Sequence, residues 1–348
     1  MAANINTSAN PDQPRRVFVT GGTGFLGHSL LPLLIAQGWQ VRALVRHPDQ
    51  HPWLRALSVD VVAGDVEDAA LLDQAVAGCQ YVIHAAGRFR FWGAAEQFER
   101  PNVQGTAHMI HGAIQAKVTR FVHISTLAVI GTPQPGRIID ETHPTAPSDP
   151  YQVSKLQGET LVMQAFEQSK LPAIILRPGA FYGPYGRYAF NRLFFEEPLI
   201  KKWRIKVDGG QHLTFPVYVG DVAAAALAAL TNGMPGERYN ICGDMLTHNA
   251  INAVVSQIAG ISPFRLNVPG WSLIALAYAW TQLSRLTHVE PYYPLNLRSY
   301  VFSDWPIRVD KAVRDLGFAP IPFAEGARQT VDWYRAAGLW RGPKGAGD

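Results

Sequence analysis

Short β-rich runs alternate with segments of helical periodicity through the first half of the chain, and this alternation limits the choice of fold. The β-rich runs cover residues 17–20, 41–45, 59–62, 81–85, 121–125 and 174–177. The helix-period segments cover residues 25–37, 69–76, 98–116 and 151–169. Strands that alternate with helices imply βαβ units with right-handed crossovers. The sequence therefore predicts an α/β fold built on a doubly wound parallel sheet.

The pattern changes after Arg177, where Gly, Pro and aromatic residues dominate ("RPGAFYGPYGRYAF"). Further helices are expected at residues 221–230, 248–258, 271–283 and 323–336. This change predicts a second, smaller domain in the C-terminal half. The first residues lack the apolar segment of a signal peptide, so residues 1–14 are expected to form a disordered tail.

Charge and cysteine content disfavour several classes of function. The 348 residues have a formal net charge of +4 from dispersed basic residues, so nucleic-acid binding is not expected. The densest basic stretch, "KKWRIK" at 201–206, is either a solvated face or a seat for an acidic substrate group. Cys79 and Cys242 lie in apolar stretches, which predicts buried free thiols, a reducing compartment and a cytoplasmic location.

The uncharged segment 266–284 raises the question of a membrane span. Only 271–280 within it is mainly apolar, which is short of the roughly 20 residues that a spanning helix needs. We expect no transmembrane span and instead a helix that lines an apolar substrate pocket, with Trp271 and Tyr278 contributing. Peripheral membrane contact is the alternative.

The stretch "VFVTGGTGFLG" places Gly21, Gly22, Gly24 and Gly27 between the first strand and the first helix. Glycines at this turn let the backbone approach a pyrophosphate, whose charge faces the helix N-terminus. A dinucleotide is therefore expected here. The second strand ends in Arg46 rather than in a carboxylate, with Arg42 earlier in the strand. A guanidinium suits a 2′-phosphate, which favours NADP(H) over the alternative, NAD(H).

Tyr151 and Lys155 are four residues apart on a helix that Pro150 helps to start. Residues at this spacing share one helix face. An ammonium beside a phenol favours the phenolate, so we expect the pKa of Tyr151 to fall below its usual value of about 10. The motif is common by chance, and the upstream hydroxyls of Ser125 and Thr126 give it weight.

Six segments in order, "TGGTGFLG", "HAAG", "NVQGT", "ISTLAVIG", "YQVSK" and "LRPGAFYGP", resemble the extended short-chain dehydrogenase/reductase superfamily. The likeness covers almost the whole chain from Arg15, and the nearest branch holds dihydroflavonol-4-reductase-like and 3β-hydroxysteroid-dehydrogenase-like proteins. It implies a Rossmann-type NADP-binding domain over 15–178, to which 216–240 returns. The smaller C-terminal substrate-binding domain is then 179–215 and 241–343. Members of the superfamily commonly form dimers through two helices, which correspond here to 98–116 and 151–169. The resemblance therefore allows a homodimer but does not fix the oligomeric state.

The resemblance also implies roles for particular residues. Tyr151 handles the proton, Lys155 lowers the tyrosine pKa and binds the nicotinamide ribose, and Thr126 rather than Ser125 contacts the reacting oxygen. Asp65 is expected at the adenine end of the cofactor, with capping of the next helix as the alternative. The expected cofactor-binding residues are Gly21, Thr23, Gly24, Phe25, Leu26, Gly27, Arg46, Asp65, Val66, Ala85, Ala86, Gly87, Asn102, Tyr151, Lys155, Pro178 and Ala180.

Departures from related branches narrow the chemistry. Dehydratases place acidic residues where Leu127 and Ala128 stand, and neither of these can transfer a proton. Nucleotide-sugar enzymes often place Tyr where Ile130 stands and Asn where Ala180 stands, so a sugar diphosphate would lose hydrogen bonds. Aromatic residues instead suggest an apolar cleft. The expected substrate contacts are Phe89, Trp92, Phe181 and Tyr182.

These observations predict an NADP-preferring oxidoreductase that interconverts a ketone and a secondary alcohol on a hydrophobic small molecule. One alternative is a nucleotide-sugar epimerase with tightly bound NAD. The other is a catalytically silent, NADP-sensing binding protein. No metal is expected, because His108 and His111 share a helix face without a carboxylate at motif spacing.

Overall fold

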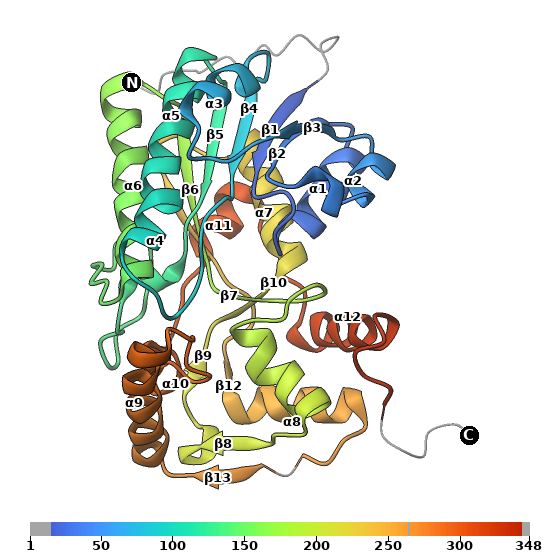
Figure 1. Cartoon of the computed structure of the whole chain (residues 1–348), viewed down its shortest axis with the longest axis vertical. Helices are drawn as coiled ribbons and strands as arrows, with labels where there is room; N and C mark the ends of the chain where they lie inside the picture. The colour runs from blue at the N-terminus through green and yellow to red at the C-terminus, as the bar shows by residue number, and fades with distance from the viewer. Residues whose placement is uncertain (1–14, 264, 343–348) are drawn as a thin grey trace.

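The computed structural model describes residues 15–263 and 265–342, so the tail expected over 1–14 lies outside the described residues. A seven-stranded parallel sheet forms the upper part of the molecule, in the strand order β11-β6-β5-β4-β1-β2-β3 (Figure 1). The strands are β1 (Arg16–Thr20), β2 (Gln40–Val45), β3 (Asp60–Ala63), β4 (Tyr81–His84), β5 (Arg120–Ile124), β6 (Ala173–Pro178) and β11 (Arg238–Ile241). The predicted parallel sheet is confirmed.

Helices cover both faces of this sheet. One apolar cluster joins it to α1 (Gly27–Ala36), α2 (Trp53–Ala56), α7 (Val219–Thr231) and α11 (Asp310–Leu316). The other joins it to α3 (Ala69–Val76), α5 (Gly105–Gln115) and α6 (Pro150–Ser169). Because the central strands are buried on both sides, they are apolar without alternation, as parallel strands in a doubly wound fold are.

One expected helix is interrupted. Residues 98–116 were predicted as continuous, but the structure has α4 (Glu96–Glu99), a π-helical turn at Arg100–Gln104 and then α5. Pro101 lies in the turn. Proline has no N–H for the regular helical hydrogen bond and its ring crowds the preceding turn, which accounts for the break.

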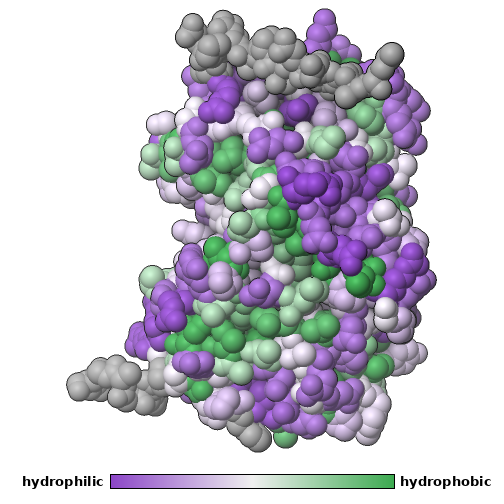
Figure 2. Space-filling model, turned by 180° about the vertical axis from the view of Figure 1, so that it is seen from behind, coloured by the Kyte–Doolittle hydropathy of each residue, from purple (hydrophilic) through white to green (hydrophobic). Residues whose placement is uncertain are grey.

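The lower part of the molecule is built from short strand pairs and helices (Figure 1). The strands are β7 (Ala180–Tyr182), β8 (Ile205–Val207), β9 (Leu213–Thr214), β10 (Pro216–Tyr218), β12 (Leu246–Thr247) and β13 (Leu266–Val268). The helical elements are a π-helical segment (Arg192–Lys201), α8 (His248–Ala259), α9 (Gly270–Thr287), α10 (Arg298–Val301) and α12 (Phe323–Ala336). Seen from behind, the molecule narrows at mid-height on one side, between the two parts (Figure 2).

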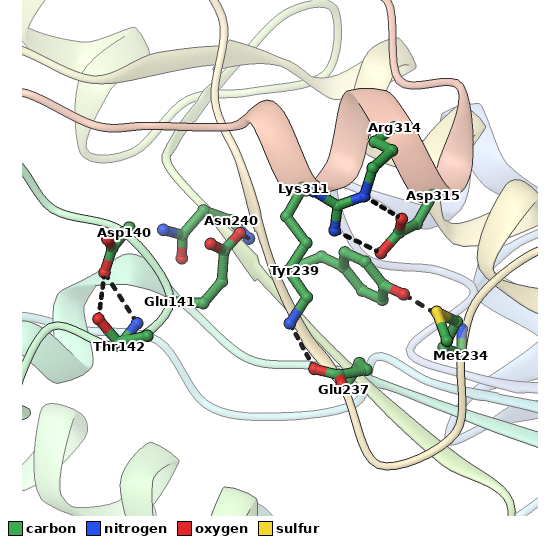
Figure 3. Close-up of polar contacts among 10 residues, drawn as sticks. All are labelled: Asp140, Glu141, Thr142, Met234, Glu237, Tyr239, Asn240, Lys311, Arg314 and Asp315. Atoms are coloured by element: carbon green, nitrogen blue, oxygen red, sulfur yellow. Dashed lines mark hydrogen bonds and ion pairs between the residues drawn. The ribbon is translucent and has the colours of Figure 1, made fainter. Parts of the chain in front are cut away.

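The edge strand β11 is secured by polar side chains from two segments far away in the sequence (Figure 3). The backbone N–H of Asn240 donates to Glu141 at 2.9 Å, and Lys311 on α11 pairs with Glu237. An edge strand otherwise presents unpaired backbone groups, and Glu141 satisfies one of them, the N–H of Asn240. Cys79 and Cys242 are both buried and free, as predicted.

Candidate active site

The glycine-rich turn between β1 and α1 forms one end of a long cleft along the carboxyl ends of the strands. Gly21 has a φ of +74°, and a Cβ there would lie 2.6 Å from the carbonyl oxygen of Ala85. A Cβ on Gly27 would lie 2.0 Å from the carbonyl oxygen of Gly22. Glycine is therefore required at both positions, for the turn and for the packing of α1 against it. The resulting backbone cradle fits the pyrophosphate of a dinucleotide.

Most of the predicted cofactor-binding residues line this cleft. They are Gly21, Thr23, Gly24, Phe25, Leu26, Arg46, Asp65, Val66, Ala85, Ala86, Gly87, Tyr151, Lys155 and Ala180. Gly27, Asn102 and Pro178 are not among the lining residues. Asn102 is buried behind the wall, where it accepts from the Arg88 N–H at 2.7 Å and donates to the Arg88 carbonyl at 3.0 Å. It therefore positions the segment after β4 and does not face the cleft.

The two arginines of β2 have different surroundings. Arg42 donates to Asp60 at 2.6 Å and to the carbonyl of Ala75 at 3.0 Å, which holds it away from the cleft. Arg46 is largely exposed at the cleft, with its Nε 3.9 Å from Asp65. Asp65 does not cap α3, because Asp68 accepts from the Leu71 N–H at the start of that helix. Arg46 and Asp65 thus form the rim where the adenosine end of a dinucleotide is expected.

Tyr151 lies in the first turn of α6, which begins where the Asp149 side chain accepts from the Gln152 N–H at 2.9 Å. The Thr126 side chain at the end of β5 is close enough to the Tyr151 hydroxyl to lower the pKa of that hydroxyl. The Ser125 hydroxyl points the other way and donates to Glu159 at 2.6 Å. Of the two hydroxyls, Thr126 is therefore the one that lies against Tyr151.

The pKa of Tyr151 differs from the expectation. Burial raises it well above 10, the Thr126 hydrogen bond opposes this, and Asp149 adds to the rise. The Lys155 ammonium donates to the Ile124 carbonyl at 2.7 Å. Burial lowers the pKa of Lys155 to about 8, although the nearby Glu159 carboxylate acts to raise it. The predicted depression of the tyrosine pKa is wrong for the chain by itself, because burial and the Asp149 charge outweigh the effect of Thr126, and Lys155 is not among the groups that shift it. Tyr151 is thus held as a neutral phenol, a proton donor.

Glu159 was missed by sequence reasoning. It is buried one helical turn beyond Lys155 and pairs with Arg177 on β6 at 2.6 Å. Tyr151, Lys155 and Glu159 follow each other at intervals of four residues, which is the signal that could have found it. The Glu159 carboxylate accepts hydrogen bonds from the Ser125 hydroxyl and from the Arg177 guanidinium. It thus links β5 and β6 to the helix that carries Tyr151 and Lys155.

Aromatic side chains form another part of the cleft wall. The Phe89 ring lies 4.7 Å from that of Tyr151, centroid to centroid, and the Phe91 N–H donates to the Tyr188 hydroxyl at 3.0 Å. Phe181 also lines the cleft, as predicted. Further lining residues, which the sequence did not single out, are Phe91, Tyr188, Phe190, Leu193, Phe194, Phe215, Leu297, Tyr300 and Val301.

Several expected substrate contacts lie elsewhere. Trp92 is absent from the cleft lining, and Tyr182 is buried in the apolar cluster around Phe195 and Phe323. Tyr182 alternates with the lining residue Phe181 along β7, so it points to the opposite side. Trp271 and Tyr278 point to solvent on α9. These four residues therefore do not line the cleft as expected. Much of the apolar lining comes instead from residues within 188–194 and 297–301.

The positions after Thr126 provide no acid or base. Leu127 and Ala128 are buried and apolar, and only Ala128 lines the cleft. Among residues 15–263 and 265–342, no group of three or more His, Cys, Asp or Glu side chains is arranged to hold a metal ion. In the same part of the chain, no helix has the length and apolar character needed to cross a membrane.

Comparison with known proteins identifies the family. A family model described as the NAD dependent epimerase/dehydratase family matches residues 17–242. A 4-hydroxy-2-methyl-3-oxo-4-farnesyl-3,4-dihydroquinoline-1-oxide ketoreductase of Stigmatella aurantiaca is 33% identical over 309 residues, covering 87% of this chain and 92% of that protein. A ceramide reductase of Caulobacter vibrioides is 30% identical over 332 residues, covering 92% and 95%.

A solved structure has a similar overall fold. The crystal structure of gox2253 superposes with a TM-score of 0.80 at 27% identity, covering 94% of this chain and 99% of that one. The matched segment contains the glycine turn, Thr126, Tyr151 and Lys155. The chain belongs to the NAD dependent epimerase/dehydratase family, within the extended short-chain dehydrogenase/reductase superfamily.

Proposed function

We propose that this protein is an NADP-preferring oxidoreductase that interconverts a ketone and a secondary alcohol on a hydrophobic small molecule. The observation that supports this most directly is that Tyr151, Thr126 and Lys155 line one cleft, with the Phe89 ring 4.7 Å from that of Tyr151, while burial raises the Tyr151 pKa and so favours the neutral phenol. A protonated phenol suits the reduction of a carbonyl, which needs one proton at oxygen. Leu127 and Ala128 supply no second acid or base for elimination of water.

The cofactor would be held by the cradle at Gly21 and Gly24, by Arg46 at the adenosine end and by Lys155 near the reacting centre. A bound nicotinamide supplies, or accepts, the hydride at the carbonyl carbon. Tyr151 donates its proton to the carbonyl oxygen as the alcohol forms and takes it back in the reverse direction. The Thr126 hydroxyl hydrogen-bonds the same oxygen and fixes its distance from the phenol.

The Lys155 ammonium stabilises the negative charge that Tyr151 acquires when it gives up the proton. It is buried and held by the Ile124 carbonyl at 2.7 Å, so little reorganisation is needed as this charge develops. Lys155 has three N–H donors, and the Ile124 contact uses one of them. The remaining donors are available to a cofactor ribose.

The substrate class follows from the wall that faces Tyr151. Phe89, Phe215 and Val301 present apolar surface there, and a hydrophobic substrate gains by leaving water for such a cleft. Two relatives have names that specify a ketoreductase for a farnesyl-bearing compound and a ceramide reductase, and these names support a hydrophobic substrate.

The test is reduction of a panel of hydrophobic ketones with NADPH and with NADH. Tyr151→Phe removes the proton donor and should lower turnover by about 10²–10⁴-fold. Tyr278→Phe, the same exchange on an exposed side chain of α9, serves as the matched control. Unchanged turnover in Tyr151→Phe would refute the assignment. NAD(H) that stays bound through purification would instead favour an epimerase, and absence of any turnover would favour a silent NADP sensor.

A further inference from the structure

Helix α9 presents an apolar face to solvent at the edge of the lower part of the molecule (Figure 1). Trp271, Tyr278, Leu283 and Leu286 are 74%, 58%, 55% and 80% exposed. At 100° per residue these positions fall on one side of the helix, opposite buried Gly270, Ala277 and Ser284. A surface helix of a water-soluble domain normally shows polar residues on that side. The apolar face of α9 therefore calls for a covering surface.

The inner side of the same helix lines an apolar pocket. Leu273, Ile274 and Ala277 form part of its wall, and the pocket shares Phe194 and Val301 with the cleft that contains Tyr151. Whatever surface covers the outer face of α9 is thus next to the apolar end of the cleft.

The basic stretch 201–206 flanks α9 at one side. The Lys201 ammonium lies 4.3 Å from the centre of the Tyr292 ring, which also contacts Trp203 and Trp280 of α9. Trp203 is half exposed, which extends the apolar surface beyond the helix. Neither 199–207 nor 265–289 contains an acidic residue, whereas their solvent-accessible cations are Lys201, Lys202, Arg204, Lys206 and Arg285; Arg265 is buried and is not part of this surface.

This combination favours an anionic lipid bilayer over a second copy of the chain. A two-fold contact through this face would set its cations against themselves and leave them without acidic partners. Anionic headgroups attract each such lysine or arginine, while tryptophan, tyrosine and leucine enter the boundary between headgroups and acyl chains. An 18-residue helix is about 27 Å long, which suits a helix lying in the plane of the interface.

We propose that α9 docks in the plane of an anionic lipid bilayer, with the 201–206 stretch over the headgroups. Docking brings the apolar end of the cleft to the membrane surface. This goes beyond the proposed oxidoreductase activity and does not depend on it.

Vesicle flotation of the full chain tests the proposal. We expect the protein to float with vesicles of equimolar phosphatidylcholine and phosphatidylglycerol, and to bind pure phosphatidylcholine much more weakly. The double variant Trp271→Ser/Leu286→Ser should weaken binding by about tenfold or more, because two apolar side chains no longer insert. Lys201→Glu/Lys202→Glu should do the same on anionic vesicles only. Val313→Ser, at a half-exposed apolar residue of α11, is the control.

All five substituted positions are exposed, so the variants should keep their fold, and circular dichroism verifies this. Wild-type protein that fails to float, or variants that float equally well, would overturn the proposal. So would sedimentation showing a dimer that Trp271→Ser/Leu286→Ser converts to a monomer, since the face would then be a self-interface. Flotation requires no turnover, so its outcome is independent of the test of the oxidoreductase function.

Discussion

Arg177 on β6 donates to the Glu159 carboxylate on α6 from Nε at 2.9 Å and from Nη2 at 2.6 Å, and both side chains are almost fully buried. The same carboxylate accepts from the Ser125 hydroxyl and lies close enough to Lys155 to raise its pKa. A single buried anion therefore faces two buried cations, Arg177 and Lys155, and also the partly exposed Arg238 at 3.6 Å.

Glu159→Gln should lower the free energy of unfolding at pH 7 by about 3–5 kcal/mol. The change leaves the Arg177 and Lys155 charges in a buried place without a counter-charge. Denaturant unfolding followed by circular dichroism measures it. Asp332→Asn breaks an ion pair with Arg335 in which both partners are about half exposed, and it should cost less than about 1 kcal/mol. Equal effects of the two substitutions would contradict the role given to Glu159.

Turnover in the reducing direction should decline as pH rises through about 8. Burial lowers the pKa of Lys155 to about 8, and loss of its proton would remove the positive charge that the proposed mechanism uses to stabilise the Tyr151 phenolate. His84 and His123 near this ammonium stay neutral, because burial and the lysine charge lower their pKa values. In Glu159→Gln the decline of kcat/KM should begin at lower pH, since the carboxylate that raises the lysine pKa is gone. An unshifted profile in this variant would count against Lys155 as the titrating group.

Turnover is expected to fall with rising pH, whereas the contribution of Lys155 to the free energy of unfolding should rise with pH. Its folded pKa of about 8 lies below its ordinary value of 10.5, so the unfolded chain binds more protons between these values. The cost of burying the ammonium is therefore fully present below about pH 8 and disappears as pH rises towards 10.5. Between about pH 8 and 10.5, turnover should therefore fall while the contribution of Lys155 to the free energy of unfolding becomes more favourable.

The parts of the fold that depend on local sequence could be predicted, and the parts that depend on distant contacts could not. Strand runs such as 41–45 and helix 69–76 have clear periodicity, and the structure has β2 and α3 there. Trp271 and Tyr278 looked like pocket residues because they are aromatic within an apolar helix. Their exposure depends on which face of α9 meets the rest of the chain, and periodicity cannot show this for the stretch 271–280, where apolar residues occur on every side of the helix.

In the candidate site too, residues in local sequence motifs could be predicted, whereas residues brought in by distant contacts could not. Gly21, Thr126, Tyr151 and Lys155 belong to motifs with fixed spacing, so the sequence is enough to find them. Tyr300 was missed because it reaches the cleft from the far end of the chain, where the Gln152 side chain of α6 donates to its hydroxyl at 2.9 Å. No local pattern encodes such a contact.

Thr126→Val should lower kcat by about 10²-fold, because it removes a hydroxyl that binds the reacting oxygen and the Tyr151 phenol. Ser125→Ala, one residue earlier, is the matched control. Its hydroxyl donates to Glu159, so its loss should reduce stability by about 1.5–3 kcal/mol with little effect on kcat. Steady-state turnover of both variants with one ketone decides between the two hydroxyls. A larger kcat loss in Ser125→Ala would show that the wrong one was chosen.

Arg46→Ala should raise the KM for NADPH by about 10–100-fold and leave that for NADH nearly unchanged. Arg46 is exposed at the cleft rim, where a charge-assisted hydrogen bond to a 2′-phosphate is worth about 1.5–3 kcal/mol. Arg42→Ala removes a guanidinium from the same strand, but Asp60 and the Ala75 carbonyl hold that side chain outside the cleft. The NADPH/NADH ratio should therefore stay at the wild-type value in Arg42→Ala. A wild-type enzyme that prefers NADH, or an Arg46→Ala variant with an unchanged NADPH/NADH ratio, would show that Arg46 does not bind a 2′-phosphate.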